Sequence, residues 1–228
     1  MLIQPKYLKL SYNLSASGPY PPAIPRLETE VLYSIEQDGA NVYKASITSH
    51  SGTHVDAPYH VAPEGYKITD FSMADFVFDR PCCIFITIGD TGLFQPEHLE
   101  PYRTVIEKSD LLLIKTGYGQ YRESDPVRYS LKNPGFSIKA AQYLRDTFPS
   151  LRALGLDVIS LAAIEVLEEG MEAHRVLLGG AGRKFLIFED LNLQDDLSDL
   201  QQVIALPLLM DGVDSGPCTV LGISRGSQ

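Results

Sequence analysis

The sequence predicts an α/β fold, bordering on α+β, in which helices flank a curved, mixed β-sheet. Continuous apolar runs of strand length occupy Cys82–Ile88 and Leu111–Lys115, which is typical of central strands covered on both faces. An earlier segment has the pattern of a hairpin, and helical periodicity lies between the later apolar runs. Strands and helices therefore alternate along the chain, which favours one mixed sheet over separate all-α and all-β parts.

Length and composition suit a single globular domain over residues 1–228, although two small domains are also compatible with this length. Hydrophobic residues make up 44% and charged residues 21% of the chain, which is ordinary for a globular protein. A chain of this length can bury a sizeable apolar core, so we expect no large disordered region.

The first elements are expected to be strands. Tyr7–Tyr12 alternates apolar residues with others and is expected to form a strand. Four prolines between residues 19 and 25 then require a loop, because proline is excluded from helix interiors and central strands. Glu30–Glu36 and Asn41–Thr48 are predicted to pair as a hairpin, with Asp38-Gly39 as the turn.

The later elements alternate between helix and strand. Ser137 is a suitable N-cap for a helix that continues to about Phe148. A second helix is expected over roughly Ala162–Leu178, with a break at Gly170. The other predicted elements are a short helix and four strands, at Asp70–Phe76, Leu156–Leu161, Lys184–Phe188, Val203–Leu208 and Cys218–Ile223.

Charge and apolar patterning exclude several classes of partner. The formal net charge is −10, from 19 basic and 29 acidic residues, with no basic cluster of the kind that binds a phosphate backbone. No apolar run approaches the ~20 residues of a membrane span, and the N-terminus lacks the pattern of a signal peptide. Cys82, Cys83 and Cys218 are interpreted as buried free thiols in a reducing compartment. We therefore expect a cytoplasmic protein that binds neither nucleic acid nor membranes.

Three of the five histidines lie within eleven consecutive residues, at positions 50, 54 and 60. Histidine is the commonest metal ligand in proteins, so the clustering indicates a metal. These histidines and Asp56 are all even-numbered, which places them on one face of an extended chain. Ten extended steps would span about 33 Å, too far for one cation. We therefore expect bends at Gly52 and Pro58 that bring His50, His54 and Asp56 together.

Two imidazoles and a carboxylate suit Zn²⁺, Mn²⁺ or Fe²⁺, and three protein ligands leave a position for water, as in catalytic rather than structural sites. No cysteine lies near this segment, which argues against a structural zinc site. His60, one bend further on, could bind the metal or act as an acid and base beside it. His98, which is isolated, is interpreted as a structural residue.

The segment His50-Ser-Gly-Thr-His-Val-Asp-Ala-Pro-Tyr-His60 resembles the signature of the putative cyclase family, which includes bacterial kynurenine formamidase and isatin hydrolase. That pattern is long and specific. Weaker similarities continue in order along nearly the whole chain, at Leu112–Gly117, Pro134–Phe136, Gly155–Ser160, Ala173–Leu178 and Glu189–Leu193.

The resemblance implies a barrel-like mixed-sheet α/β domain that assembles as a homodimer or larger homo-oligomer. It implies one or two divalent ions, with Zn²⁺ expected and Mn²⁺ as in isatin hydrolase-like members. Asp56 would bridge the two ions. The implied ligands of the first ion are His50, His54 and Asp56, and those of the second are Asp56, His174 and Glu189. His60 would be the acid/base. Asp190 is the rival of Glu189, because one step along a strand reverses the face.

The expected activity is hydrolysis, by metal-activated water, of a small amide: an N-formyl aromatic amide such as N-formylkynurenine, or a cyclic amide or lactone. His60 would pass a proton to the leaving nitrogen. Two alternatives stay open. The same site could serve a metal-dependent lyase or dehydratase in which His60 removes a C–H proton. The chain could also be a non-catalytic metal- or ligand-binding protein of the same fold.

Overall fold

The computed structural model describes residues 4–180 and 184–226. Within this part of the chain, nine strands form the main sheet, in the order β5-β12-β13-β4-β11-β10-β8-β6 with β1 paired to β13. The strands are β1 Lys6–Lys9, β4 His54–Asp56, β5 Val77–Phe78, β6 Pro81–Phe85, β8 Leu111–Lys115, β10 Ala153–Leu156, β11 Leu186–Glu189, β12 Leu200–Pro207 and β13 Ser215–Ser224.

The sheet is mixed and nearly closed, as the resemblance implied. Strands β6, β8, β10 and β11 run parallel to one another, whereas β4 is antiparallel to both of its neighbours, β11 and β13. Strand β12 pairs with β13 and β5, again antiparallel. Strand β6, at one end of the path, lies against β12 near the other end, so the sheet curls into a barrel-like shape.

Two apolar cores lie on opposite faces of the parallel strands. On β8, Leu112 and Ile114 join the core between sheet and helices, and Leu111 and Leu113 join the core enclosed by the curved sheet. All four side chains are buried, which confirms the prediction that this run forms a central strand covered on both faces. On β11, Ile187 and Phe188 divide between the same two cores.

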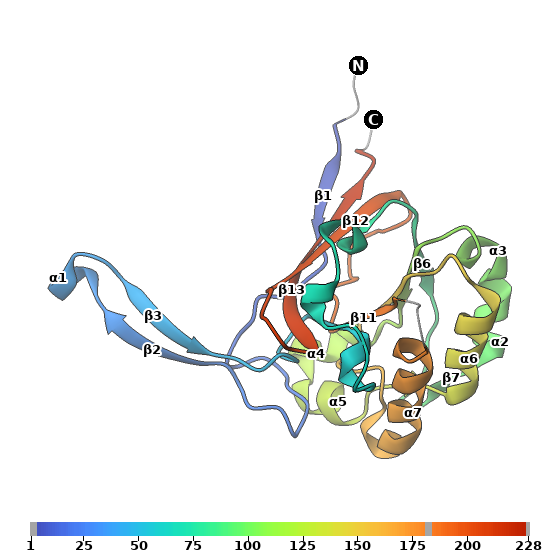
Figure 1. The fold of residues 1–228 in the computed structure, drawn as a ribbon, viewed down its shortest axis with the longest axis horizontal. Coiled ribbons are helices and arrows are strands. Elements are labelled where there is room, and N and C mark those ends of the chain that lie inside the picture. The colour runs from blue at the N-terminus through green and yellow to red at the C-terminus, as the bar shows by residue number, and fades with distance from the viewer. Residues whose placement is uncertain (1–3, 181–183, 227–228) are drawn as a thin grey trace.

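The helices lie mainly outside the sheet, where α6 and α7 pack against each other (Figure 1). The predicted N-cap of α6 is confirmed, because the Ser137 hydroxyl accepts a hydrogen bond from the amide of Ala140. The α-helices are α1 Ile35–Asp38, α2 Pro96–Leu99, α3 Arg103–Ile106, α4 Tyr121–Ser124, α5 Pro126–Leu131, α6 Ile138–Thr147 and α7 Leu167–Leu178. Single 3₁₀ turns occur at Pro58–His60, Ile68–Asp70, Met73–Phe76, Glu100–Tyr102, Tyr118–Gln120 and Ile164–Val166.

Three expectations about local structure were wrong. The run Cys82–Ile88 was expected to be a central strand covered on both faces, but β6 is the last strand of the sheet path, ends at Phe85 and is buried only at alternate residues. The predicted strand Leu156–Leu161 corresponds to β10, which ends at Leu156, because its partner β8 ends at Lys115 and the chain then turns at Gly117. The expected break at Gly170 is absent, and α7 runs through it without interruption. The glycine allows close packing, since a Cβ at this position would lie 2.4 Å from the Cα of Ala162.

The predicted hairpin is confirmed and forms an arm, which comprises β2 Glu28–Tyr33, α1 and β3 Val42–Ser46. The arm projects away from the body of the molecule (Figure 1), and every residue of both strands is exposed. At its tip, Gly39 adopts a left-handed conformation with φ of 80°. The remaining short strands, β7 Leu93–Phe94 and β9 Gly135–Phe136, pair with each other.

The three cysteines are free, as predicted, and Cys82 and Cys218 are buried while Cys83 is half-buried. No helix in the described ranges combines the length and the apolar character needed to cross a bilayer.

Candidate metal centre

The histidine-rich segment bends where the sequence predicted. Gly52 adopts a positive φ of 62°, so the backbone reverses between His50 and His54. Strand β4 then lasts for only three residues, and Pro58 opens the 3₁₀ turn that ends at His60. These two bends gather the even-numbered side chains into one cluster instead of spreading them along a strand.

The register of β4 determines which acidic residue joins the cluster. Glu189 on β11 lies directly opposite His54, and directly opposed residues on antiparallel strands share a face. Val55, between His54 and Asp56, points into the core enclosed by the sheet. The carboxylate of Glu189 therefore meets the imidazoles on the face that α7 covers, where α7 contributes His174.

Asp190, the rival of Glu189, is engaged elsewhere. Its two carboxylate oxygens accept hydrogen bonds from Nε and Nη2 of Arg122, at 2.8 and 2.7 Å, and Oδ1 also accepts from the hydroxyl of Tyr129 at 2.7 Å. This buried ion pair lies outside the histidine cluster and has a structural explanation of its own.

The cluster is compact. Asp56 lies at its centre, with Oδ1 at 3.0 Å from Nδ1 of His50 and 3.5 Å from Nε2 of His54. Its other oxygen, Oδ2, is 3.9 Å from Nε2 of His174. The carboxylate of Glu189 lies between His54 and His174, at 3.4 Å from Nε2 of His54 and 3.2 Å from Nε2 of His174. In Asp56, Oδ1 faces His50 and His54 while Oδ2 faces His174, and this is the arrangement of a bridging carboxylate.

Backbone carbonyls set the orientation of two of these rings. Nδ1 of His54 donates to the carbonyl of Gly52, and Nδ1 of His174 donates to the carbonyl of Gly170, each at 2.8 Å. In the neutral rings, Nε2 must then carry the lone pair, and it faces carboxylate oxygens. Nε2 of His54 and Oδ1 of Asp56 are buried without a hydrogen-bond partner. A cation between these atoms would satisfy both of them, so the residues fit a divalent metal.

The electrostatics of the cluster favour added positive charge. Burial opposes ionisation of His50, but attraction to the nearby carboxylates of Asp56 and Asp214 raises its pKa to about 10. Burial likewise opposes ionisation of His54 and His174, and nearby carboxylates raise both pKa values. Burial would raise the pKa of Glu189, but the two imidazoles hold it well below its usual range. Without a metal, protons supply the positive charge that these carboxylates attract.

Asp56 belongs to two sets of three potential metal ligands, and within each set the ligand atoms lie within 4.8 Å of one another. One set comprises His50, His54 and Asp56, and the other comprises Asp56, His60 and His174. Both contain imidazole nitrogen and carboxylate oxygen and no sulfur, which suits a borderline divalent cation such as Zn²⁺ or Mn²⁺. The second set places His60 close enough to be either a ligand or a neighbouring acid and base.

Sequence reasoning missed Asp214, which precedes β13 in a turn-rich segment. Oδ2 of this carboxylate lies 3.0 Å from Nε2 of His50 and 2.8 Å from Nδ1 of His60. The next residue, Ser215, lies opposite Asp56 in the register of β13 with β4, and its hydroxyl is 3.0 Å from Nε2 of His50. No motif in the sequence signals this role, because Asp214 is 154 residues away from His60.

A cavity of about 330 Å³ opens onto the cluster. The proline-rich loop forms one wall through residues 21–24, and the start of α7 forms another through Leu167 and Met171. Ala162 and Ile164 add further apolar surface, and among the described residues no lysine or arginine lines this cavity. It therefore combines apolar walls with a polar floor of imidazoles and carboxylates, as small-molecule sites commonly do.

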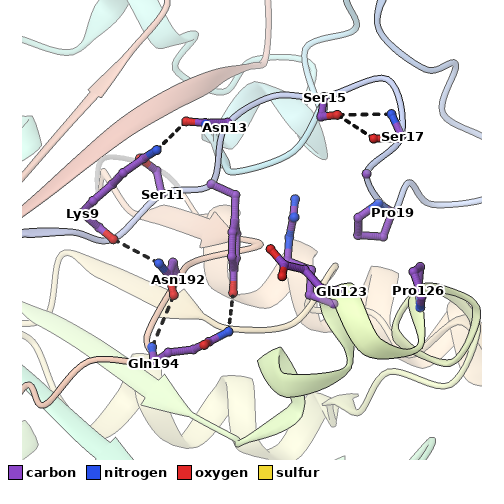
Figure 2. A pocket seen from close by; sticks show the side chains of 13 residues that line it. Lys9, Ser11, Asn13, Ser15, Ser17, Pro19, Glu123, Pro126, Asn192 and Gln194 are labelled. Atoms are coloured by element: carbon purple, nitrogen blue, oxygen red, sulfur yellow. Dashed lines mark hydrogen bonds between the residues drawn. The ribbon is translucent and has the colours of Figure 1, made fainter.

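A larger hollow, of about 610 Å³, begins at the N-terminal side of the same loop, near Pro19 (Figure 2). Its polar groups have partners within the chain. Lys9 donates to Asn13, and the guanidinium of Arg122 lies 3.8 Å from the centre of the Tyr12 ring while it pairs with Asp190. Asp190 thus neutralises Arg122, and Lys9 is hydrogen-bonded to Asn13, so both cationic groups are already engaged within the chain.

His98 and the loop after β8 both lie outside the histidine cavity. His98 is structural, as expected, since its Nδ1 accepts a hydrogen bond from the amide of Gln95 at the start of α2. The loop after β8 does not line the histidine cavity. Instead the amides of Thr116 and Gly117 donate to the buried carboxylate of Asp157, at 2.8 and 3.2 Å.

Buried imidazoles and carboxylates on one face of a nearly closed mixed sheet define the class: an α/β protein with a candidate divalent-metal centre. The family model described as putative cyclase matches residues 8–163, more than half of the chain, and the chain belongs to that family. A relative from Bacillus anthracis named kynurenine formamidase is 28% identical over 190 residues, covering 82% of this chain and 83% of the relative.

Solved structures share the fold over nearly the whole length. Isatin hydrolase A from Labrenzia aggregata, bound to benzyl benzoate, superposes with a TM-score of 0.80 at 21% identity, covering 97% of this chain and 94% of the other. A structure described as a potential metal-dependent hydrolase with cyclase activity has a TM-score of 0.75 at 23% identity, covering 98% and 100%.

Proposed function

We propose that the chain is a metal-dependent hydrolase of a small amide, either an N-formyl aromatic amide such as N-formylkynurenine or a cyclic amide or lactone. One observation carries this proposal: ring nitrogens of the buried His54 and His174 and of the half-buried His50 converge on Asp56, and His60 lies beside them on the floor of an apolar cavity. The names of the relatives, kynurenine formamidase and isatin hydrolase, support the amide class of substrate.

We propose Zn²⁺ as the native metal, with Mn²⁺ as the alternative, and one or two ions at the site. His50, His54 and Asp56 would hold the first ion. Asp56 would bridge to a second ion that His174 and Glu189 would also hold. Nε2 of His174 and Oε1 of Glu189 are 3.2 Å apart. When bound, such a cation supplies Lewis acidity, which polarises a carbonyl group and lowers the pKa of a water molecule.

The chain itself contributes orientation and proton transfer. The apolar walls, which include Ile24 and Met171, would hold an aromatic ring and exclude bulk water from the reacting carbonyl. Nδ1 of His60 is hydrogen-bonded to Asp214, which leaves Nε2 as the nitrogen available to the cavity. We assign to this atom the transfer of a proton to the leaving nitrogen as the C–N bond breaks.

His60→Ala tests the proposal, with His98→Ala as a control because His98 is a structural histidine outside the cavity. Loss of general acid–base catalysis should reduce turnover by roughly 10²- to 10⁴-fold while metal content stays at the wild-type value. A variant that loses one equivalent of metal would identify His60 as a ligand instead. Substrates for the assay are N-formylkynurenine, isatin and an aromatic lactone, with metal content measured by elemental analysis.

Reaction in ¹⁸O-labelled water separates the proposed hydrolysis from the other readings of the site. Hydrolysis places one labelled oxygen in the acid product. A lyase or dehydratase would leave the product carboxylate unlabelled. A fully metal-loaded protein that turns over none of the amide and lactone substrates would contradict the assignment as an amide hydrolase and favour a binding role.

We propose that the chain assembles as a homodimer or larger homo-oligomer, with the exposed arm at an interface between copies. The arm exposes large apolar side chains, among them Val31, Tyr33, Ile35 and Tyr43 at 53% to 63% exposure. A two-stranded ribbon is only marginally stable when water covers both of its faces, so a partner surface would stabilise it. The arm also joins the cavity wall directly, because the proline-rich loop precedes β2 and His50 follows β3.

Light scattering coupled to size exclusion would test this assembly with Tyr43→Ser. The control is Val127→Ser, which removes a 68% exposed apolar side chain on the body of the molecule. We expect the arm variant to weaken self-association and the control to leave it unchanged. A wild-type chain that is monomeric at high concentration would contradict the proposal. We also propose a cytoplasmic location, which the three free thiols support.

A further inference from the structure

We propose that Asp214 is a positioning residue that sets the tautomers of both His50 and His60 through a single carboxylate oxygen. This inference deepens the proposed function and rests on it for the role of His60. The geometry is direct, because Oδ2 lies 3.0 Å from Nε2 of His50 and 2.8 Å from Nδ1 of His60, and the two rings are neighbours with centroids 4.5 Å apart.

An ionised carboxylate only accepts hydrogen bonds, so each nitrogen that faces Asp214 must carry a hydrogen. In the neutral rings the opposite nitrogens then carry lone pairs. On His50 that atom is Nδ1, which lies 3.0 Å from Oδ1 of Asp56, in the proposed cation site. On His60 it is Nε2, the nitrogen available to the cavity. One carboxylate therefore prepares one ring to bind a cation and the other to accept a proton.

The chain holds Asp214 in place from several sides. Its backbone carbonyl accepts a hydrogen bond from the amide of Ala57 at 2.9 Å, which ties it to the residue after β4. Its second oxygen, Oδ1, accepts from the hydroxyls of Ser49 and Ser215 at 3.3 and 3.4 Å. With the side chain only 25% exposed, Asp214 is an anchored group, as expected of an outer partner that orients metal-binding histidines.

A competing reading makes Asp214 a direct ligand, because potential ligand atoms of His50, His60 and Asp214 also lie within 4.8 Å of one another. The two readings differ in metal stoichiometry. Removal of an orienting carboxylate lowers affinity at an otherwise complete site, whereas removal of a ligand from a three-residue site eliminates that site. They also differ in the tautomer of His60, which only the positioning role sets.

The experiment compares Asp214→Ala and Asp214→Asn in zinc-loaded protein, with Asp211→Ala as the control because Asp211 is an exposed aspartate of the same loop. The asparagine amide oxygen can still accept from both imidazoles while its amide group donates to the two serine hydroxyls. Zinc affinity is measured by competition with a chelator, zinc stoichiometry by elemental analysis, and the tautomer of His60 by ¹⁵N NMR of the imidazole nitrogens.

For Asp214→Ala we expect a ~10- to 100-fold loss of zinc affinity, the range typical of outer partners of metal ligands, with unchanged stoichiometry. His60 should leave the Nδ1–H tautomer, and kcat at saturating zinc should fall while KM stays close to wild type. Asp214→Asn should keep the His60 tautomer and most of the zinc affinity. This variant also tests the proposal if Asp214→Ala does not fold. Asp211→Ala should match the wild type.

Loss of a full zinc equivalent with an unchanged His60 tautomer would overturn the proposal in favour of direct ligation. Wild-type affinity and tautomer in Asp214→Ala would overturn it as well. These zinc and NMR measurements need no substrate. A protein that hydrolyses none of the tested amides would therefore count against the proposed function and leave this result on Asp214 intact.

Discussion

The pKa values of the histidine cluster predict that metal affinity increases steeply with pH. His50 has a pKa raised to about 10 in the metal-free protein, and those of His54 and His174 are raised too. Burial opposes each of these shifts, and the carboxylates of Asp56 and Glu189 outweigh it. At neutral pH His50 therefore carries a proton that a cation must displace, because only neutral imidazole binds a metal.

The magnitude follows from the number of protons displaced. Below the histidine pKa values, each released proton increases apparent affinity by about tenfold per pH unit. Displacement of the His50 proton should thus make a cation bind about tenfold more tightly for each unit between pH 6 and pH 8, and the raised pKa of His54 acts in the same direction. At a free concentration of 100 Kd the cation stabilises the fold by about 2.7 kcal/mol. For a chain of this length that raises Tm by about 5–11 °C.

Metal-free stability should change in the opposite direction. A histidine whose folded pKa exceeds its unfolded value contributes stability that is fully present below pH ~6.5 and is lost as pH rises through the folded pKa. For His50 that loss extends to about pH 10. Asp56 and Glu189 have lowered pKa values, so their contribution is present above pH ~4 and is lost in acid. Between pH 7 and pH 10 the metal-free protein should therefore lose stability.

Calorimetric titration of zinc into metal-free protein, in two buffers with different ionisation enthalpies, counts the released protons directly. Thermal unfolding with and without EDTA at pH 6, 7 and 8 measures the stabilisation. We expect at least one proton per ion at pH 7, released from His50, and a Tm difference that grows with pH. Binding that releases no protons and shows no pH dependence would refute the reasoning, because the imidazoles would then be neutral before the metal arrives.

Three further predictions concern packing, the neighbouring ion pair and the cavity wall. Gly170→Ala should lower the free energy of unfolding by about 1–3 kcal/mol, measured by urea denaturation, because the new methyl group overlaps Ala162 at 2.4 Å; unchanged stability would contradict the close packing. Asp190→Asn should cost about 3–5 kcal/mol, because it leaves Arg122 buried without its counter-charge, while zinc stoichiometry stays unchanged; loss of metal would instead place Asp190 in the centre. Ile24→Ala should raise KM for an aromatic amide several-fold with little change in kcat, and an unaffected KM would exclude this wall from substrate contact.

Local sequence determined several elements of this protein. The capping serine of α6 and the hairpin around Gly39 depend on interactions within a few residues, and the continuous apolar run of β8 by itself indicates burial on both faces. All three appear as predicted. The bend at Gly52 is also determined locally, because the positive φ of this one glycine is enough to bring His50 and His54 together. The short segment around β4 thus encodes half of the candidate metal centre by itself.

Tertiary structure decided the other half. The choice of Glu189 over Asp190 follows from the register of β11 against β4, which a single-residue shift would reverse and which no local pattern specifies. Asp214 reaches the cluster only because β13 pairs with β4, across more than 150 residues of chain. Gly170 was misinterpreted for the same reason, since its role depends on Ala162 packing against α7. Nearest-neighbour chemistry determines turns and caps, whereas contacts between distant segments depend on how the whole sheet closes.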